Sequence, residues 1–178
     1  HGTLMATGVS RFDGVVLNII DSHCVLPVGD VQLRPFPVPH DAREPAQFVF
    51  SDGDKSLGVL TDAGVSTSHI EAMLSGVDAL VLECNHDLDL LMNSAYPYTL
   101  KQRISGRLGH LDNRTASGLL AALPQAKQRL QHVIAAHLSK QNNTPALARR
   151  ALAEALGCED TWIGVATQNE GFGWREIA

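Results

Sequence analysis

The chain has 178 residues, of which 44% are hydrophobic, 19% are charged and 5% are aromatic, and its formal net charge is −5. This length and composition fit one globular domain and exclude a disordered or fibrous protein. The negative net charge excludes a basic surface over the whole molecule that would attract nucleic acid, but it is compatible with a local basic patch.

The first part of the chain is predicted to be rich in strands. A run of branched apolar residues over 14–20 is typical of a strand. The prolines within residues 26–45 exclude a helix there and favour short edge strands or an extended loop. Two apolar runs, at 48–50 and 57–60, flank a turn sequence, which predicts a hairpin, and residues 61–64 then form a tight turn.

The second part alternates apolar strands with helices that carry capping residues. The expected strands cover residues 78–84, 131–136 and 162–166. The expected helices cover residues 66–75, 87–92, 112–123 and 144–156. This alternation predicts one layered α/β domain.

The three cysteines, Cys24, Cys84 and Cys158, form no CxxC pair. An odd number without such spacing disfavours a disulfide scaffold, so we expect a reducing, cytoplasmic environment. No apolar run approaches the roughly 20 residues that span a bilayer, so we expect no membrane partner.

Acidic and imidazole side chains fall at the ends of the predicted strands. Asp62 lies at the end of the strand over 57–61, Glu83 ends the strand that begins at Asp78, and His137 follows the strand over 131–136. His40 closes the proline-rich segment, and His110 precedes the helix that begins near residue 112. In α/β folds, sites form at strand ends and in the loops that leave them, and these residue types are ligands of Zn²⁺, Mn²⁺ and Fe²⁺.

Each of these residues also has a structural interpretation. Asp62 in Thr-Asp-Ala-Gly is a common turn former, Glu83 can be solvated or paired in a salt bridge, and His110 can belong to the start of a helix. His137 directly follows a buried run, so it is desolvated and needs a partner under either interpretation.

Five short motifs occur in an order that resembles one family of enzymes. They are Thr61-Asp62-Ala63-Gly64, Leu82-Glu83-Cys84-Asn85-His86-Asp87, the segment from Tyr96 to Ile104, Gly109-His110-Leu111-Asp112-Asn113, and the segment from Ala136 to Pro145. Together they resemble the metallo-β-lactamase fold in its phosphodiesterase and nuclease branch, and in particular the YycJ/WalJ-like group of bacterial hydrolases. The resemblance implies an α/β fold of the αββα sandwich type, with two mixed β-sheets between helix layers.

The resemblance also implies roles for the residues at the strand ends. His40, Asp62 and His137 match metal ligands of the family, and Asp62 matches the carboxylate that bridges two ions. Glu83 and His110 resemble a pair that moves a proton to the leaving group in the tRNA-processing members. We therefore expect two divalent ions, zinc or manganese, and a phosphodiester substrate, with nucleic acid as the favoured class.

Basic residues near His110 support the expectation of a nucleic-acid substrate. They are Lys101, Arg103, Arg107 and Arg114. These side chains are expected to hold phosphates, or else to form a solvated basic stretch. Ser139 follows His137 and offers its hydroxyl either to a phosphate or to the next helix as a cap. The candidates for substrate binding are therefore Lys101, Arg103 and Ser139.

The motif His-x-His-x-Asp-His, which supplies most metal ligands in the family, is absent from the sequence. We therefore expect residues 1–178 to be the C-terminal portion of a single domain whose N-terminal portion is missing, and we expect this chain alone to be inactive or nearly so. Two alternatives stay open. One is a small-molecule cyclic phosphodiesterase on the same scaffold, and the other, if no metal binds, is a non-catalytic interaction module.

Overall fold

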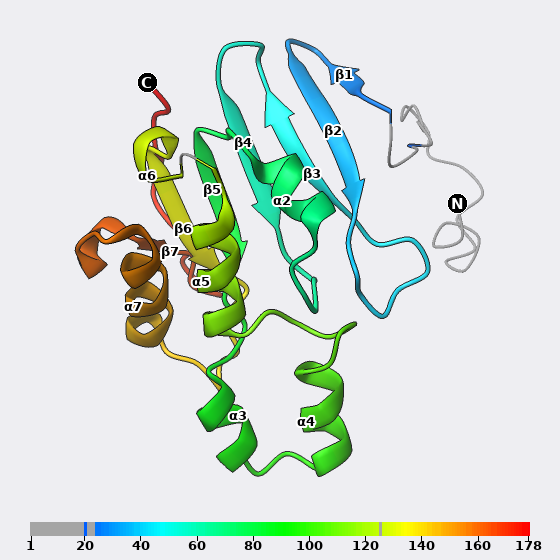
Figure 1. Cartoon of the computed structure of the whole chain (residues 1–178), viewed down its shortest axis with the longest axis vertical. Helices are drawn as coiled ribbons and strands as arrows, with labels where there is room; N and C mark the ends of the chain where they lie inside the picture. The colour runs from blue at the N-terminus through cyan, green and yellow to red at the C-terminus, as the bar shows by residue number, and fades with distance from the viewer. Residues whose placement is uncertain (1–19, 21–23, 125) are drawn as a thin grey trace.

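The computed structural model describes residue 20, residues 24–124 and residues 126–178. These residues contain one seven-stranded sheet whose strands follow one another in chain order (Figure 1). The strands are β1 (Leu26–Val28), β2 (Val31–Pro37), β3 (Ala46–Ser51), β4 (Ser56–Leu60), β5 (Ala79–Glu83), β6 (His132–Ala136) and β7 (Gly164–Val165). The strand predicted over 14–20 lies outside the described residues, apart from Ile20.

The directions of the strands bring four strand ends to one edge of the sheet. β1 to β4 are antiparallel to their neighbours, whereas β4 to β7 are parallel to one another. β2 therefore runs in the same direction as β4, β5 and β6, and the carboxyl ends of these four strands share one edge. In Figure 1 this is the lower edge, next to α3 (Leu88–Asn93) and α4 (Tyr98–Ile104).

Helices cover one face of the sheet, and the core lies between them and the strands. The helices are α2 (Ser68–Leu74), α5 (Asn113–Ala122), α6 (Ala126–Arg129) and α7 (Pro145–Leu156), followed by a short 3₁₀ helix, η1 (Asp160–Trp162). Leu60, Leu82 and Ala135 are paired across β4, β5 and β6, and none of them is exposed. On the opposite face, which the alternation of a strand assigns to Val59 and Val81, the side chains are only partly buried.

The structure confirms the predicted α/β class and most of the predicted elements. Thr144 caps α7, Pro145 is its first residue, and Gly157 ends it with a left-handed φ of 68°. The strand expected over 162–166 is shorter, because Trp162 belongs to η1 and only Gly164 and Val165 pair with β6. The sequence analysis did not predict α4, which has no fully buried residue and no side-chain cap, so that its apolar pattern is limited to the half-buried Leu100 and Ile104.

The prolines of β2 occupy the part of the strand that has a neighbour on one side only. β1 pairs with residues 31–33, whereas β3 pairs with residues 32–37, so Pro35 and Pro37 lie beyond the end of β1. A proline lacks the N–H that a second neighbour would need. The part of β2 that contains these prolines therefore behaves as the predicted edge strand, although β2 as a whole is longer. None of the helices in the described ranges is long and apolar enough to cross a membrane.

The turn after β4 and the loop before His110 pack backbone against backbone. A Cβ atom on Gly64 would overlap the carbonyl of Arg107 and lie 2.6 Å from the amide nitrogen of Gly109. The amide of Gly64 also donates to the carbonyl of Pro39, at 2.9 Å. This close approach requires glycine and brings the turns that carry Asp62 and His110 together.

We expect the substitution Gly64→Ala to lower the free energy of unfolding by about 1–3 kcal/mol, because the added methyl group meets backbone that cannot move aside easily. The matched control is Gly118→Ala in α5, where nothing lies within 4 Å of the added atom. There the better helix propensity of alanine should raise stability by up to about 1 kcal/mol. Urea unfolding of both variants measures this, and a Gly64→Ala variant as stable as the unaltered chain contradicts the packing described.

Candidate metal centre

Two candidate ligands occupy strained backbone positions directly beyond their strands. Asp62 has a φ of 52° and His137 a φ of 58°, and within the described ranges these are the residues other than glycine with a positive φ. This left-handed conformation costs an ordinary residue about 1–2 kcal/mol. Such strain persists where surrounding contacts hold the backbone in place, and it concentrates at functional sites.

Glu83, the last residue of β5, connects three parts of the site. Its side chain is fully buried. The Oε1 atom accepts hydrogen bonds from Nδ1 of His110, at 2.8 Å, and from Nδ1 of His137, at 2.7 Å. The Oε2 atom accepts from the amide of Ala63, at 3.0 Å, which is the peptide that follows Asp62. Glu83 thereby fixes both imidazole rings and one strained turn.

The hydrogen bonds of Glu83 decide its charge. Burial acts to raise the pKa of Glu83, but the bonds from His110, His137 and Ala63 outweigh it and hold the pKa of this carboxyl below its ordinary value. The hydrogen bond to Glu83 in turn raises the pKa of His137, against the effect of burial. Because an ionised carboxylate only accepts hydrogen bonds, both imidazoles donate to it from Nδ1.

His40 is oriented by a different acceptor. Its Nδ1 atom lies 3.0 Å from the carbonyl of Gly109, and the amide of Asp41 donates to the carbonyl of Leu108, at 2.9 Å. A carbonyl accepts a hydrogen bond, so the proton of a neutral ring lies on Nδ1 and the lone pair lies on Nε2. His40 and His137 therefore both direct Nε2 toward Asp62, and that of His40 also lies 3.4 Å from Oδ1 of Asp41.

These nitrogen atoms surround one carboxylate oxygen at a spacing that suits an ion. The Oδ1 atom of Asp62 lies 3.8 Å from Nε2 of His40 and 3.8 Å from Nε2 of His137, and 3.7 Å from Nδ1 of His110. These separations are too long for hydrogen bonds. Ligands that share one zinc ion about 2.0–2.2 Å away lie at comparable distances from one another.

The residues present therefore fit a divalent ion. Asp62, Glu83, His110 and His137 each offer a ligand atom within 4.8 Å of the others. Glu83 already accepts hydrogen bonds from two imidazoles and a backbone amide. It therefore suits the role of the acceptor that orients the ring of a metal-ligating histidine. Of the other three, His110 directs Nδ1 at Glu83, which leaves Asp62 and His137 as donors for an ion. His40 is not in this group, but its Nε2 atom lies 3.8 Å from Asp62 and can add a third donor. Imidazole nitrogen and carboxylate oxygen suit zinc or manganese.

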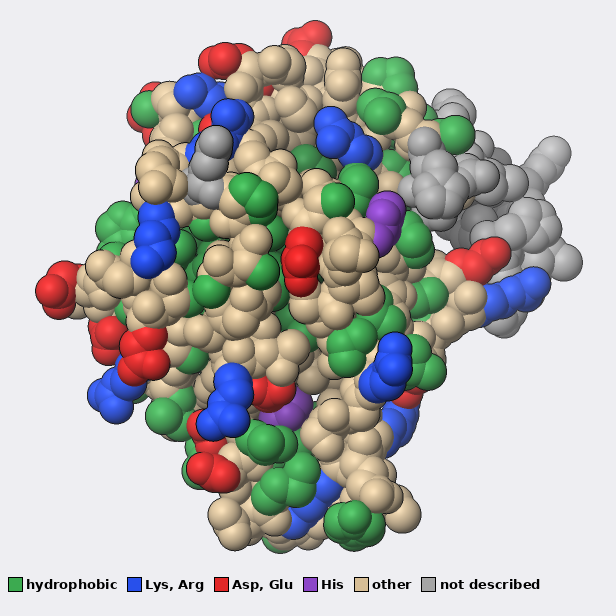
Figure 2. All heavy atoms as spheres, in the orientation of Figure 1, with side chains coloured by type: hydrophobic (Ala, Val, Ile, Leu, Met, Phe, Trp, Pro, Cys, Tyr) green, Lys and Arg blue, Asp and Glu red, His purple; other side chains and the backbone are tan. Residues whose placement is uncertain are grey.

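A cavity of about 420 Å³ opens onto these groups between the sheet edge and α4. Its lining consists of His40, Asp41, Asp62, Leu100, Arg103, Ile104, Gly109, His110 and His137. In Figure 2 a histidine side chain is visible beside a hollow at the lower end of the molecule, with acidic and basic side chains around it. The volume lies within the range of small-molecule sites, at roughly 300–1,000 Å³.

The structure separates the three candidates for substrate binding. Arg103 lines the cavity and donates from Nε to Asp41, at 2.6 Å, which holds the pKa of that carboxyl below its usual value. Lys101 does not line the cavity, and its ammonium group donates to the carbonyl of Met92, at 2.7 Å. The hydroxyl of Ser139 accepts from the amide of Asn142, at 3.2 Å. Substrate contacts by these residues stay predictions.

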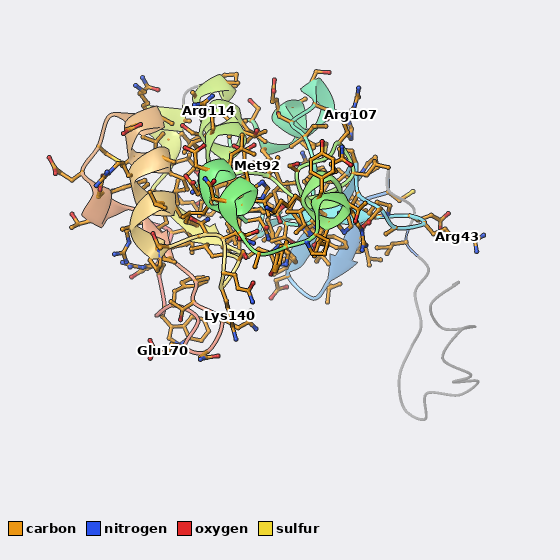
Figure 3. The ribbon with its side chains drawn as sticks, turned by 90° about the horizontal axis from the view of Figure 1, so that it is seen from below. Arg43, Met92, Arg107, Arg114, Lys140 and Glu170 are labelled. Carbon is orange, nitrogen blue, oxygen red and sulfur yellow. The ribbon has the colours of Figure 1, made fainter. Side chains whose placement is uncertain are left out.

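The other basic residues near His110 in the sequence spread out in space. Seen from below, Arg107 and Arg114 lie apart along the upper margin of the molecule, and Lys140 lies at the lower margin (Figure 3). They do not form one compact basic patch in this view.

Sequence reasoning missed the apolar wall of the cavity and Asp41. Leu100 and Ile104 both line the cavity, and their spacing of four residues places them on one face of α4. That spacing was a usable signal once a helix was assigned there. The ion pair between Asp41 and Arg103 joins residues that are 62 positions apart, so no local pattern could reveal it.

Residues 3–133 match the sequence model of the beta-lactamase superfamily domain. The exodeoxyribonuclease YycJ of Bacillus anthracis is 34% identical over 137 residues, which are 77% of this chain and 50% of that protein. The exodeoxyribonuclease WalJ of Streptococcus pneumoniae is 35% identical, with the same coverage. The chain thus spans about half the length of these curated relatives.

Solved structures of the same fold are also similar to the chain. The metallo-beta-lactamase fold protein YhfI of Bacillus subtilis has a TM-score of 0.64 at 15% identity and covers 87% of this chain and 52% of its own. Zn(2+)-bound PqqB of Methylobacterium extorquens has a TM-score of 0.67 at 21% identity and covers 96% of this chain and 61% of its own. These likenesses confirm the predicted metallo-β-lactamase fold; of the two mixed sheets expected for it, the described residues contain one.

We expect Glu83→Gln to lower the free energy of unfolding by about 1–3 kcal/mol, because a glutamine amide would face one of the donors that now bond the carboxylate. Glu154→Gln on the exposed side of α7 is the matched control and should change stability by less than about 0.5 kcal/mol. Denaturant unfolding compares the two. Equal stabilities would show that Glu83 does not hold the site together.

Proposed function

The chain belongs to the beta-lactamase superfamily, and from this premise we propose that it carries part of the active site of a metal-dependent phosphodiesterase that acts on nucleic acid as an exonuclease. The observation that carries the proposal is the arrangement of His40 and His137 around the Asp62 carboxylate, with both Nε2 atoms 3.8 Å from Oδ1. The similarity to two proteins named as exodeoxyribonucleases, at 34% and 35% identity, supports the substrate class.

In this proposal His40, Asp62 and His137 hold a divalent ion. A bound ion supplies Lewis-acid polarisation of a phosphoryl oxygen and lowers the pKa of water to near neutrality. The family resemblance implies two ions, and the two oxygens of Asp62 suit a bridging role. Three ligands suffice for one ion, so a second ion needs ligands in addition to those that the described residues bring together.

His110 is the proposed acid for the leaving group. Its Nδ1 atom is bonded to Glu83, so Nε2 is the atom that can exchange a proton with a substrate oxygen. The carboxylate of Glu83 fixes the ring orientation. The ring lines the cavity, so the proton can reach a bound phosphodiester.

Arg103 is the proposed phosphate contact among the substrate-binding candidates. Its side chain is 70% exposed and donates from Nε to Asp41. The remaining N–H groups of the guanidinium can therefore bind a phosphate. The negative charge of Asp41 balances this arginine, so the cavity is not strongly basic. Leu100 and Ile104 offer an apolar surface to the sugar or base next to that phosphate.

The test measures hydrolysis by the full-length protein. Metal-dependent, salt-sensitive degradation of end-labelled DNA supports the proposal, because phosphate contacts weaken with salt. Hydrolysis of bis(4-nitrophenyl) phosphate that excess DNA does not inhibit would favour the small-molecule phosphodiesterase instead, for which the cavity of about 420 Å³ is large enough. If the protein shows neither metal binding nor hydrolysis, the non-catalytic interaction module is the function that remains.

Two substitutions should separate metal binding from proton transfer. Asp62→Asn is expected to abolish both metal content and turnover, because the ion loses its anionic ligand. His110→Ala is expected to lower turnover by about 10²–10⁴-fold with metal content unchanged. Elemental mass spectrometry and the DNA assay provide the two measurements.

The matched controls are Asp54→Asn on the β3–β4 turn and His69→Ala on α2, both exposed and expected to leave metal content and turnover unchanged. Loss of metal in His110→Ala would contradict the proposed division of roles, because it would make His110 a ligand.

A further inference from the structure

The end of β5 carries a second polar side chain directed at the site, two residues beyond Glu83. Asn85 donates from Nδ2 to the carbonyl of His137, at 3.0 Å. The two residues thus act on the two left-handed positions in the same manner. Glu83 binds the peptide group that follows Asp62, and Asn85 binds the peptide group that follows His137.

Asn85 also joins the two loops that carry the imidazoles. The backbone amide of Asn85 donates to the backbone carbonyl of Leu111, at 2.9 Å, and Leu111 directly follows His110. The backbone carbonyl of Asn85 accepts from the backbone amide of Ser139, at 2.7 Å, and Ser139 lies two residues after His137. The side chain is itself held, because its Oδ1 atom lies 3.3 Å from Nδ1 of His86, a ring that is 1% exposed.

The bond from the Asn85 side chain to the His137 carbonyl depends on the identity of residue 85, whereas the two backbone bonds do not. Any residue at position 85 can make the two backbone bonds, whereas the bond to the His137 carbonyl requires a donor such as the asparagine amide. A left-handed φ is unfavourable for histidine, so the peptide after it tends to rotate unless it is held. Rotation would turn the imidazole away from Glu83 and Asp62, which it now reaches with Nδ1 at 2.7 Å and Nε2 at 3.8 Å.

We propose that Asn85 is a positioning residue whose side-chain amide keeps His137 in the left-handed conformation that directs its Nε2 toward the metal position. The role in metal binding rests on the proposed function, because it takes His137 as a ligand. The effect on the conformation of His137 does not depend on a metal. The two can therefore be measured separately.

The first measurement uses nuclear magnetic resonance of the metal-free chain at constant pH. In Asn85→Ala we expect the ring nitrogen signals of His137 and its HN–Hα coupling to change, while the coupling of Asp62 stays as in the unaltered chain. Asn85→Asp, which keeps the shape but cannot donate, should give the same change. The matched control is Asn93→Ala, because Asn93 makes the same kind of bond, from Nδ2 to the carbonyl of Asp89 at 2.9 Å, within exposed α3.

The second measurement is calorimetric titration with Zn²⁺ alone. Loss of a group that orients a metal-ligating histidine typically lowers affinity by about 10–100-fold. We expect such a loss in Asn85→Ala and none in Asn93→Ala. The titration uses the full-length protein, as the hydrolysis test does. If the unaltered full-length protein binds no Zn²⁺, the proposed function fails, while the conformational result on His137 still stands or falls by itself.

Unchanged His137 signals in both Asn85 variants would overturn the proposal. A purely structural role would lower stability or shift signals throughout the fold without the selective change at His137, and that result would overturn it as well. Should either variant not fold, hydrogen exchange of the unaltered chain decides the matter. The side-chain amide protons of Asn85 should exchange more slowly than those of Asn93, and equal rates would contradict the bond.

Discussion

The buried carboxylate of Glu83 is the interaction on which the site depends. An ionised carboxyl without partners inside a protein is costly, so this residue is stable only where several donors surround it. The donors come from three places, the ring of His110, the ring of His137 and the amide of Ala63. Satisfying one buried charge therefore draws three separate loops to the end of β5 and sets the distances between the groups that they carry.

The arrangement of the strands makes this convergence possible. β2, β4, β5 and β6 run in one direction and end at one edge, so His40, Asp62, Glu83 and His137 leave the sheet on the same side. Left-handed backbone at Asp62 and His137 then turns both side chains inward within one or two residues of their strands. The left-handed conformation is unfavourable for both residues. It is tolerated because Glu83 and Asn85, at the end of the neighbouring strand β5, bind the peptide groups that follow Asp62 and His137.

The sequence was sufficient to predict those features that depend on local patterns. Polar residues at the ends of buried apolar runs predicted that Asp62, Glu83 and His137 lie at strand ends, and capping residues predicted the start of α7. Features that depend on distant partners could not be predicted. The bond from Asn85 to His137 spans 52 positions, and the shared use of Glu83 by two histidines requires the register of β5 and β6. α4 gave only a weak signal, the spacing of Leu100 and Ile104, because it buries no residue fully, although it lines the cavity.

The central claim is that His40, Asp62 and His137 hold a divalent ion, and anomalous X-ray diffraction from crystals grown with Zn²⁺ or Mn²⁺ tests it most directly. The account predicts an anomalous peak about 2.0–2.2 Å from Nε2 of His40, Oδ1 of Asp62 and Nε2 of His137. A peak coordinated by Glu83 instead, or no peak between these three side chains at a saturating metal concentration, would contradict it.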